Sequence, residues 1–197
     1  MEGLGFAKTK EFWFKFGWGV FLGAISAIGA LIFVALMDFG IDLLWPEPPD
    51  PAFLSGSWQI VAIMTAGGFL VGLIHQFTDA REVNPFAAMG KGIMETKPVP
   101  AGLLVSLITL VSGFSLGPEV PAGMIAAGLS QWISKWRKLS DEVRKSNIIS
   151  GVVAAYSGVF TSPLAITMFP LELPHMQSIA YYGTLIIAGA AAVIGFV

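Results

Sequence analysis

Residues 112–128 read S-G-F-S-L-G-P-E-V-P-A-G-M-I-A-A-G, and they place one carboxylate, that of Glu119, in apolar surroundings. Between Lys97 and Lys135 no other residue carries a formal charge. A lone carboxylate at the depth of a lipid bilayer is costly in free energy, so it needs a local reason to be there. The residues beside Glu119 supply that reason.

Glu119 is expected in the first turn of a helix. Gly117 permits a turn that other residues resist, Pro118 suits the first helical position, and residues 120–136 form an apolar run long enough to be the helix. The first turn offers unpaired backbone N–H groups and the positive end of the helix dipole, which favour an anion. The sequence therefore predicts an anion pathway in which Glu119 competes with the anion. The expected anion-binding residues of the helix start are Gly117, Pro118, Val120 and Pro121. The alternative is an ordinary acid that caps a helix.

Composition predicts an all-α integral membrane protein. Apolar residues make up 55% of the sequence and charged residues 12%, whereas about a quarter of a soluble domain is charged. The mean hydropathy is +0.74. Several charge-free windows exceed the roughly 20 residues that span a bilayer as a helix. These windows are residues 16–37, 52–74, 98–118, 146–171 and 173–197.

Other classes of function have little support. The net charge of −2 gives no indication of nucleic-acid binding, and the lack of cysteine excludes disulfides and thiolate metal sites. His75 and His175 are far apart, and no phosphate-binding loop or Ser-His-Asp set is present. We therefore expect no metal, no cofactor and no enzyme active site.

Basic and aromatic residues are interleaved near the N-terminus, where Lys8, Lys10 and Lys15 stand among phenylalanines and tryptophans. This pattern predicts an amphipathic interfacial helix over residues 1–18, on the cytoplasmic side by the positive-inside rule. A frayed tail is the alternative. The membrane domain is then expected over residues 19–197, as a multi-pass protein of the cell membrane.

Within that domain the sequence predicts a first span over residues 17–45 and a second span over 58–77, joined by an external proline-rich loop over 45–51. A loop with a short broken helix is expected over 78–100, and an apolar helix over 99–114. The glutamate helix should end near residues 132–138 and be followed by a basic cytoplasmic loop to Asn147, a helix over 150–172 that is interrupted at Pro163, and a final helix over 181–197. An interruption at membrane depth is typical of transporters. A kinked packing helix is the alternative.

Two of these segments resemble a known family. The run from Gly117 to Pro121, shortly after Ser112 and Gly113, is similar to the glycine-x-glutamate-x-proline motif of the CLC chloride channels and chloride/proton exchangers. Residues 150–172 resemble a second motif of that family, G-x-A-A-x-x-x-x-F-x-x-P-L-A-x-x-x-F-x-x-E. The matching residues there are Gly151, Ala154, Ala155, Phe160, Pro163, Leu164, Ala165, Phe169 and Glu172.

The resemblance implies a helical fold of two inverted repeats with broken and re-entrant helices, of which this chain covers the first. It implies homodimers in the lipid bilayer, each subunit with its own pore for chloride or another small anion. Glu119 matches the gating glutamate, whose carboxylate occupies an anion site when ionised and leaves it when protonated or displaced by chloride. The resemblance also suggests residues that line the pore or a proton path, namely Ser115, Phe160, Pro163 and Glu172.

The chain departs from the family pattern in three places. The family's early G-S-G-I-P motif, whose serine helps hold chloride, is missing. Residues 90–93 resemble it in sequence. The spacing to Glu119, however, predicts the counterpart of this motif near residues 81–85. Leu173 stands where exchangers often have a second glutamate. The motifs of the second repeat are missing too, so we expect a fragment, or a half-sized subunit that forms a homo-oligomer or pairs with a second-repeat partner. Small residues within 151–158 and 189–192 are expected to form a face without a packing partner in an isolated monomer.

The leading hypothesis is thus a membrane anion channel or carrier, for chloride, gated by Glu119. A chloride/proton antiporter is one alternative. A non-conducting half-repeat that serves as a scaffold or partner subunit is the other.

Overall fold

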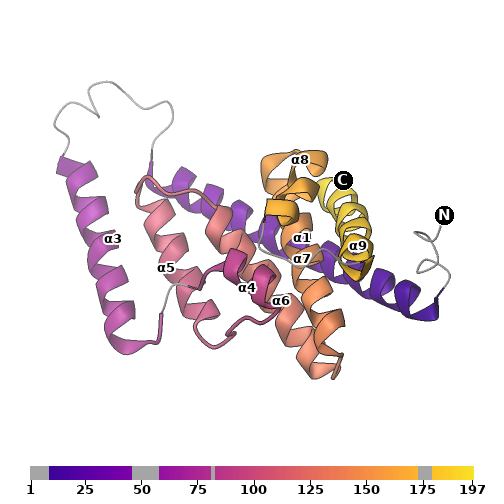
Figure 1. Cartoon of the computed structure of the whole chain (residues 1–197). Helices are drawn as coiled ribbons and strands as arrows, with labels where there is room; N and C mark the ends of the chain where they lie inside the picture. The colour runs from indigo at the N-terminus through magenta and orange to yellow at the C-terminus, as the bar shows by residue number, and fades with distance from the viewer. Residues whose placement is uncertain (1–8, 46–57, 81–82, 173–178) are drawn as a thin grey trace.

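The computed structural model describes residues 9–45, 58–80, 83–172 and 179–197, and the regular structure of these residues is helical (Figure 1). The helices are α1 (Lys10–Leu44), α3 (Trp58–Phe77), α4 (Pro85–Lys91), α5 (Val99–Val111), α6 (Glu119–Trp136), α7 (Asp141–Phe160), α8 (Pro163–Met168) and α9 (Ile179–Phe196), with the 3-10 helix η2 (Phe169–Glu172) after α8. The all-α prediction is confirmed. The predictions for the proline-rich loop, Arg81, Leu173 and His175 fall outside the described residues.

Two helices in the described part, α1 and α3, are long and apolar enough to cross a membrane, and two shorter apolar helices cover Val99–Val111 and Tyr182–Phe196. Two predicted windows do not form one continuous helix each. The window over residues 98–118 contains α5 and the connection that follows it, because α5 ends at Val111 and α6 begins only at Glu119. The window over 146–171 is divided between α7 and α8.

The first helix, α1, runs without a break for 35 residues. Thr9 caps its start, since the Thr9 hydroxyl accepts a hydrogen bond from the Phe12 amide at 3.3 Å. From residue 10 onward, the segment expected to be a separate interfacial helix is therefore the first part of the first span. Residues 10–18 contain no proline that would end a helix. Their place at a membrane surface stays a prediction.

The middle of the bundle is α7, which packs against α1, α6 and α9. Small residues bring these helices close together: the backbone of Ala154 in α7 lies against Gly195 in α9, and Gly23 in α1 lies against Ala191. Ala154 and Ala191 are completely buried. The expectation that the small residues of α7 and α9 lack a packing partner is therefore wrong, because the two helices cover each other within one chain, as small residues allow in membranes.

The connection between α6 and α7 is shorter than the basic loop expected up to Asn147. The Ser140 hydroxyl accepts a hydrogen bond from the Val143 amide at 3.5 Å and caps α7, whose first turn holds Asp141 and Glu142. Arg144 thus belongs to α7, where its Nε donates to the carbonyl of Gly92 at 3.1 Å. A serine followed by two acids is typical of a helix start, and this signal outweighs the high charge of the segment.

Left-handed backbone conformations mark two chain reversals. After α5, Gly113 has a φ of 85°, a region that favours glycine. After α7, Thr161 has a φ of 50° and precedes Pro163, the first residue of α8, which cannot continue the preceding helix. The interruption at Pro163 agrees with the sequence prediction, and α8 and η2 complete the broken segment.

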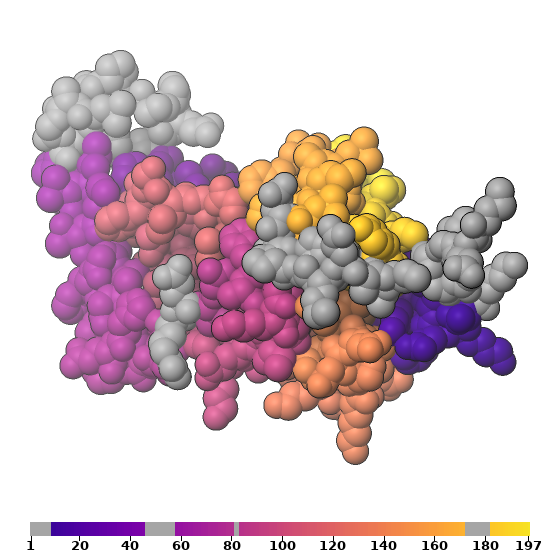
Figure 2. Space-filling model, viewed as in Figure 1, coloured from indigo at the N-terminus to yellow at the C-terminus, as the bar shows by residue number. Residues whose placement is uncertain are grey.

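One flank of the molecule is formed by α3, which packs chiefly against α5 (Figure 1). A close approach of Gly67 to Ser112 joins the two helices. Most of the remaining surface of α3 is exposed and apolar, with Trp58, Val61 and Phe69 turned outward. In the space-filling view, α3 lies at the edge opposite the N-terminal end of α1 (Figure 2).

Candidate functional site

Glu119 is the first residue of α6, a helix start that has no side-chain cap. Pro118 is its N-cap residue, one position before the place predicted for it, and the Pro118 carbonyl accepts a hydrogen bond from the Ala122 amide at 2.9 Å. Pro121 carries no N–H group, so the donors that the first turn leaves unpaired are the amides of Glu119 and Val120. Of the predicted anion-binding residues, the two prolines shape the helix start, while Gly117 and Val120 retain N–H groups.

The Glu119 side chain turns back over the segment that precedes α6. A Cβ atom built on Gly117 would overlap the carboxyl carbon and both carboxylate oxygens of Glu119. The Glu119 side chain is half-buried, and within the described part of the chain no hydrogen bond or ion pair engages it. A carboxylate without a fixed partner thus lies beside the unpaired amides of a helix start.

A second polar group near this helix start is the hydroxyl of Tyr156 in α7. Tyr156 is 2% exposed, and its hydroxyl has no hydrogen-bond partner among the described residues. The hydroxyl and the ring of Pro85 both lie against Gly123, in the second turn of α6. Tyr156 is also within electrostatic range of Glu119. Since buried tyrosine hydroxyls usually have a partner, Tyr156 is available to bind a group that enters the site.

Sequence reasoning missed Tyr156, although it lies within the second motif. The available signal was a single amphipathic aromatic residue among the small and aliphatic residues of 150–159. Buried hydroxyls of this kind are costly unless they are hydrogen-bonded. Such a residue therefore merits attention in any apolar helix that packs beside a predicted site.

Aromatic side chains from α4 and from the end of α7 contact the ring of Tyr156. Its ring centroid lies 5.7 Å from that of Phe160 and 5.8 Å from that of Phe86 in α4. Phe86 in turn lies 5.2 Å from Phe169 in η2. Phe160, which was predicted to line the path, is thereby joined to the Glu119 region through Tyr156.

The other predicted path residues are placed less closely. Ser115 is exposed in the segment between α5 and α6, and Pro163 begins α8. Glu172 is the last residue of η2, and its side chain lies outside the described part. In the described part of the chain no hydrogen bond links Ser115 or Pro163 to Glu119, so their roles stay predictions.

The start of α4 lies at the place predicted for the missing serine motif. The Asn84 side-chain oxygen caps α4 by accepting hydrogen bonds from the amides of Phe86 at 2.9 Å and Ala87 at 3.1 Å. Residues 90–93, which resemble the missing serine motif in sequence, lie at the opposite end of α4, where Gly92 has a φ of 69° and terminates the helix. A helix C-terminus is the negative end of the dipole, so this look-alike does not favour an anion.

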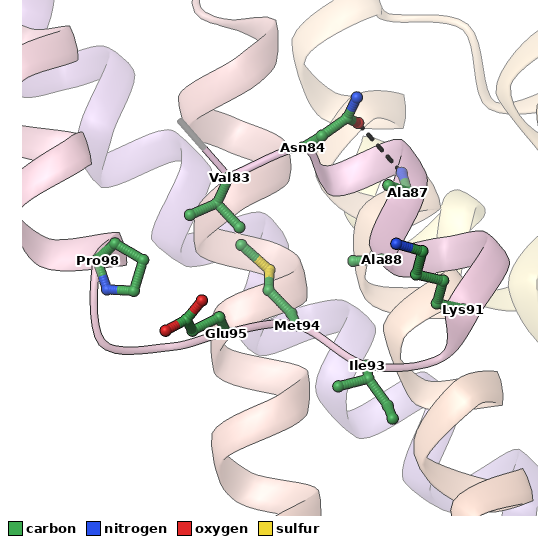
Figure 3. Close-up of a pocket in the computed structure, with 9 residues that line it drawn as sticks. All are labelled: Val83, Asn84, Ala87, Ala88, Lys91, Ile93, Met94, Glu95 and Pro98. Atoms are coloured by element: carbon green, nitrogen blue, oxygen red, sulfur yellow. Dashed lines mark hydrogen bonds between the residues drawn. The ribbon is translucent and has the colours of Figure 1, made fainter. Parts of the chain in front are cut away.

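A cavity of about 240 Å³ runs along α4 and the segment that follows it (Figure 3). Asn84 lines one end of this cavity, and Lys91, in the last turn of α4, lines the other. Glu95 lines it from the connecting segment. The cavity therefore combines both signs of charge. No group of His, Asp or Glu side chains in the described part of the chain has an arrangement that could hold a metal ion.

Comparisons with known proteins point to one family. The family model described as voltage gated chloride channel matches residues 67–197, a range that includes α4 to α9 and therefore Glu119 and Tyr156. Chloride channel protein CLC-e of Arabidopsis thaliana is 22% identical over 165 residues, which are 77% of this chain and 23% of that protein. The putative chloride channel protein ClcB-like of Ralstonia nicotianae is 24% identical over 168 residues, which are 77% of this chain and 39% of that protein. The chain thus spans less than half the length of these curated relatives.

Proposed function

Because the chain belongs to the voltage-gated chloride channel family, we propose that it forms part of a membrane anion pathway, for chloride, that the Glu119 carboxylate controls. It is a membrane protein, and its family is one of channels rather than of enzymes. In this proposal the protein lies in the cell membrane, with its N-terminus on the cytoplasmic side by the positive-inside rule.

The position of the Glu119 carboxylate is the observation that carries the proposal. It lies against Gly117, beside the amides that α6 leaves unpaired, and no described residue binds it. Chloride and a carboxylate are both anions, and both are stabilised by free N–H groups and by the dipole of a helix start. The two therefore compete for one site. When the carboxyl group is protonated or turned aside, the amides of Glu119 and Val120 become free for chloride.

The hydroxyl of Tyr156 adds a neutral donor to this site. Its burial and its lack of a partner among the described residues support a role in binding the anion that replaces the carboxylate. A neutral donor suits a path from which the ion must also leave, since it holds an anion less firmly than a fixed cation does. Phe86 and Phe160 keep the Tyr156 ring in place from α4 and from the end of α7.

The rest of the pathway comes from a further chain or segment that provides an opposing repeat. The two inverted repeats that the family resemblance implies support this proposal, and the chain spans less than half the length of the curated relatives. A second copy of this chain is one source, in keeping with the homo-oligomer expected from the sequence. Proton-coupled exchange of chloride remains an alternative mode for the same site. A non-conducting scaffold is the alternative function.

Chloride efflux from liposomes tests the proposal. Vesicles that hold the purified protein should release chloride faster than protein-free vesicles, and Glu119→Ala should change the rate because the competing carboxylate is removed. Asp42→Asn is the matched control, since it removes an exposed carboxylate at the end of α1. Uphill proton movement driven by a chloride gradient would identify an exchanger. Vesicles that stay chloride-tight, although the protein in them is folded and helical, would favour the scaffold.

A further inference from the structure

The end of α6 and the beginning of α1 meet through one arginine and two tryptophans. The guanidinium carbon of Arg137 lies 5.6 Å from the ring centroid of Trp18 in α1 and 5.7 Å from that of Trp136 in α6. Trp136 is stacked on Trp132, with ring centroids 6.4 Å apart and an angle of 11° between the rings. An exposed cation is therefore held on an aromatic surface that two helices share.

An open apolar groove lies along the same part of α1. Its volume is about 360 Å³, and it is lined by Trp13, Phe14, Gly17, Trp18 and Phe21. Gly17 leaves the floor of the groove open, because a Cβ atom built there would have no neighbour within 4 Å. Trp18 belongs both to the groove and to the Arg137 contact, so the groove is continuous with the cation. Figure 1 shows this end of α1 at the edge of the bundle, away from α3.

The basic residues at this end outnumber the acidic ones that neutralise them. Glu11 and Glu142 each bind Lys15, with distances of 2.9 Å between the charged atoms, and Asp141 binds Arg144 at 3.0 Å. Other cations at this end have no carboxylate partner among the described residues. These are Lys10, Lys135, Arg137 and Lys138. The end of α6 therefore carries unneutralised positive charge beside an apolar groove.

We propose that an anionic phospholipid binds to this surface. The surface consists of the groove on α1, of Lys135 in the last turn of α6, and of Arg137 and Lys138 directly after α6. The phosphate of the lipid binds Arg137 and the neighbouring lysines, and an acyl chain lies in the groove. Tryptophans and arginines together are typical of the membrane–water boundary, where each basic residue near an anionic surface strengthens binding about five-fold.

The helix dipole gives a simpler reason for basic residues at this helix end, since cations are favourable near any helix C-terminus. That effect accounts for Lys135. It does not account for the packing of Arg137 on Trp18, which belongs to a different helix, or for the open groove next to it. A free phosphate ion fits only half of this surface, because it has no apolar part to fill the groove.

Native mass spectrometry of the full chain, released from mixed bilayers of phosphatidylglycerol and phosphatidylcholine, tests the assignment. The protein should retain phosphatidylglycerol at least ten-fold over phosphatidylcholine, and the preference should shrink as salt is raised during preparation. Glycerol 3-phosphate, which has the headgroup without acyl chains, should not displace the lipid. Equal retention of the two lipids would overturn the assignment, and displacement by glycerol 3-phosphate would replace it with a phosphate site.

Variants locate the lipid on the protein. Arg137→Gln should reduce the preference about five-fold, and the additional change Lys138→Gln should reduce it further. Lys91→Gln is the control, because Lys91 is an exposed lysine at the end of a different helix, α4, and should leave the preference unchanged. An equal loss with Lys91→Gln, or no loss with Arg137→Gln, contradicts the site. If the double variant is unstable, the salt dependence of the wild-type protein and the single variant still decide.

Discussion

The carboxylate of Glu119 occupies the space in which a side chain at Gly117 would begin. This contact joins the residue before the N-cap of α6 to the first residue of the helix, and it explains why glycine is needed at position 117. Gly117 does not adopt a left-handed backbone conformation, so alanine fits its backbone, and the three atoms nearest to the added Cβ atom all belong to the Glu119 carboxylate. The relationship gives a direct way to move Glu119 without altering it.

Gly117→Ala should therefore displace the Glu119 carboxylate from the helix start and change chloride efflux in the same direction as Glu119→Ala. In a Glu119→Ala background the alanine at position 117 should have little further effect, because the group that it displaces is gone. Gly72→Ala is the control, since a Cβ atom there would have no neighbour within 4 Å. Additive effects of the two substitutions on efflux would mean that Gly117 acts independently of Glu119.

Tyr156→Phe tests the neutral donor. Removing a buried hydroxyl that has no partner among the described residues should leave the free energy of unfolding unchanged or raise it by up to about 1 kcal/mol. Chloride efflux should nonetheless change, because the anion loses a donor. Ser157→Ala removes a neighbouring buried hydroxyl, which also has no partner in the described part, and should leave efflux unaltered. Similar efflux in both variants and the wild type would remove Tyr156 from the site.

The contact between α7 and α9 predicts a stability effect. A Cβ atom on Gly195 would press on the backbone of Ala154, so Gly195→Ala should lower the free energy of unfolding by about 1–3 kcal/mol. Gly72→Ala, in the open surface of α3, should instead be neutral or stabilise by up to about 1 kcal/mol. Thermal unfolding in detergent, followed by circular dichroism, compares the two. Equal unfolding temperatures would contradict the close packing of α7 and α9.

Lys138 ends α6 in a conformation that favours glycine. Its φ is 52°, and its amide and that of Leu139 donate to the carbonyls of Lys135 and Ser134 at 3.1 and 2.9 Å, the pattern of a Schellman turn. Lys138→Gly should raise the free energy of unfolding by about 1 kcal/mol, because glycine adopts this conformation without strain.

Lys138→Gly should at the same time weaken the retention of phosphatidylglycerol, so stability and lipid binding should move in opposite directions. Lys138→Ala removes the charge but keeps the backbone strain, and it should weaken lipid retention without the gain in stability. If the retention of phosphatidylglycerol changes in the same direction as the free energy of unfolding in both variants, the lysine acts through the fold alone.

Several parts of the architecture were predictable because they depend on local chemistry. The helix start at Glu119 follows from Pro118, although the left-handed turn residue before it is Gly113 rather than Gly117. The break at Pro163 follows from the missing N–H group and the ring of proline. The end of the basic loop was misplaced because charge was given more weight than the capping signal of Ser140. Basic residues interleaved with aromatic residues predict an interfacial position for residues 10–18, but this pattern does not show whether their helix continues into the next one, as α1 does.

The packing partners and the full site were harder to predict. The small residues of α7 and α9 indicate close approach but do not say which helix approaches, so the mutual contact of Ala154 and Gly195 required the structure. Tyr156 and Glu119 are separated in the sequence by α6, a turn and most of α7, and only the packing of α6 on α7 places them near each other. Long-range relationships of this kind leave no periodic signal.

The pH dependence of chloride efflux in wild-type protein and in Glu119→Gln tests the central claim most directly. Glutamine has the shape of the protonated carboxyl group and never carries the charge that competes with chloride. Wild-type efflux should rise as the pH is lowered, because the carboxyl group becomes neutral and leaves the helix start to the anion. Glu119→Gln should show the high rate at every pH, while Asp42→Asn keeps the wild-type profile. A pH profile that is identical in wild type and Glu119→Gln would contradict the account.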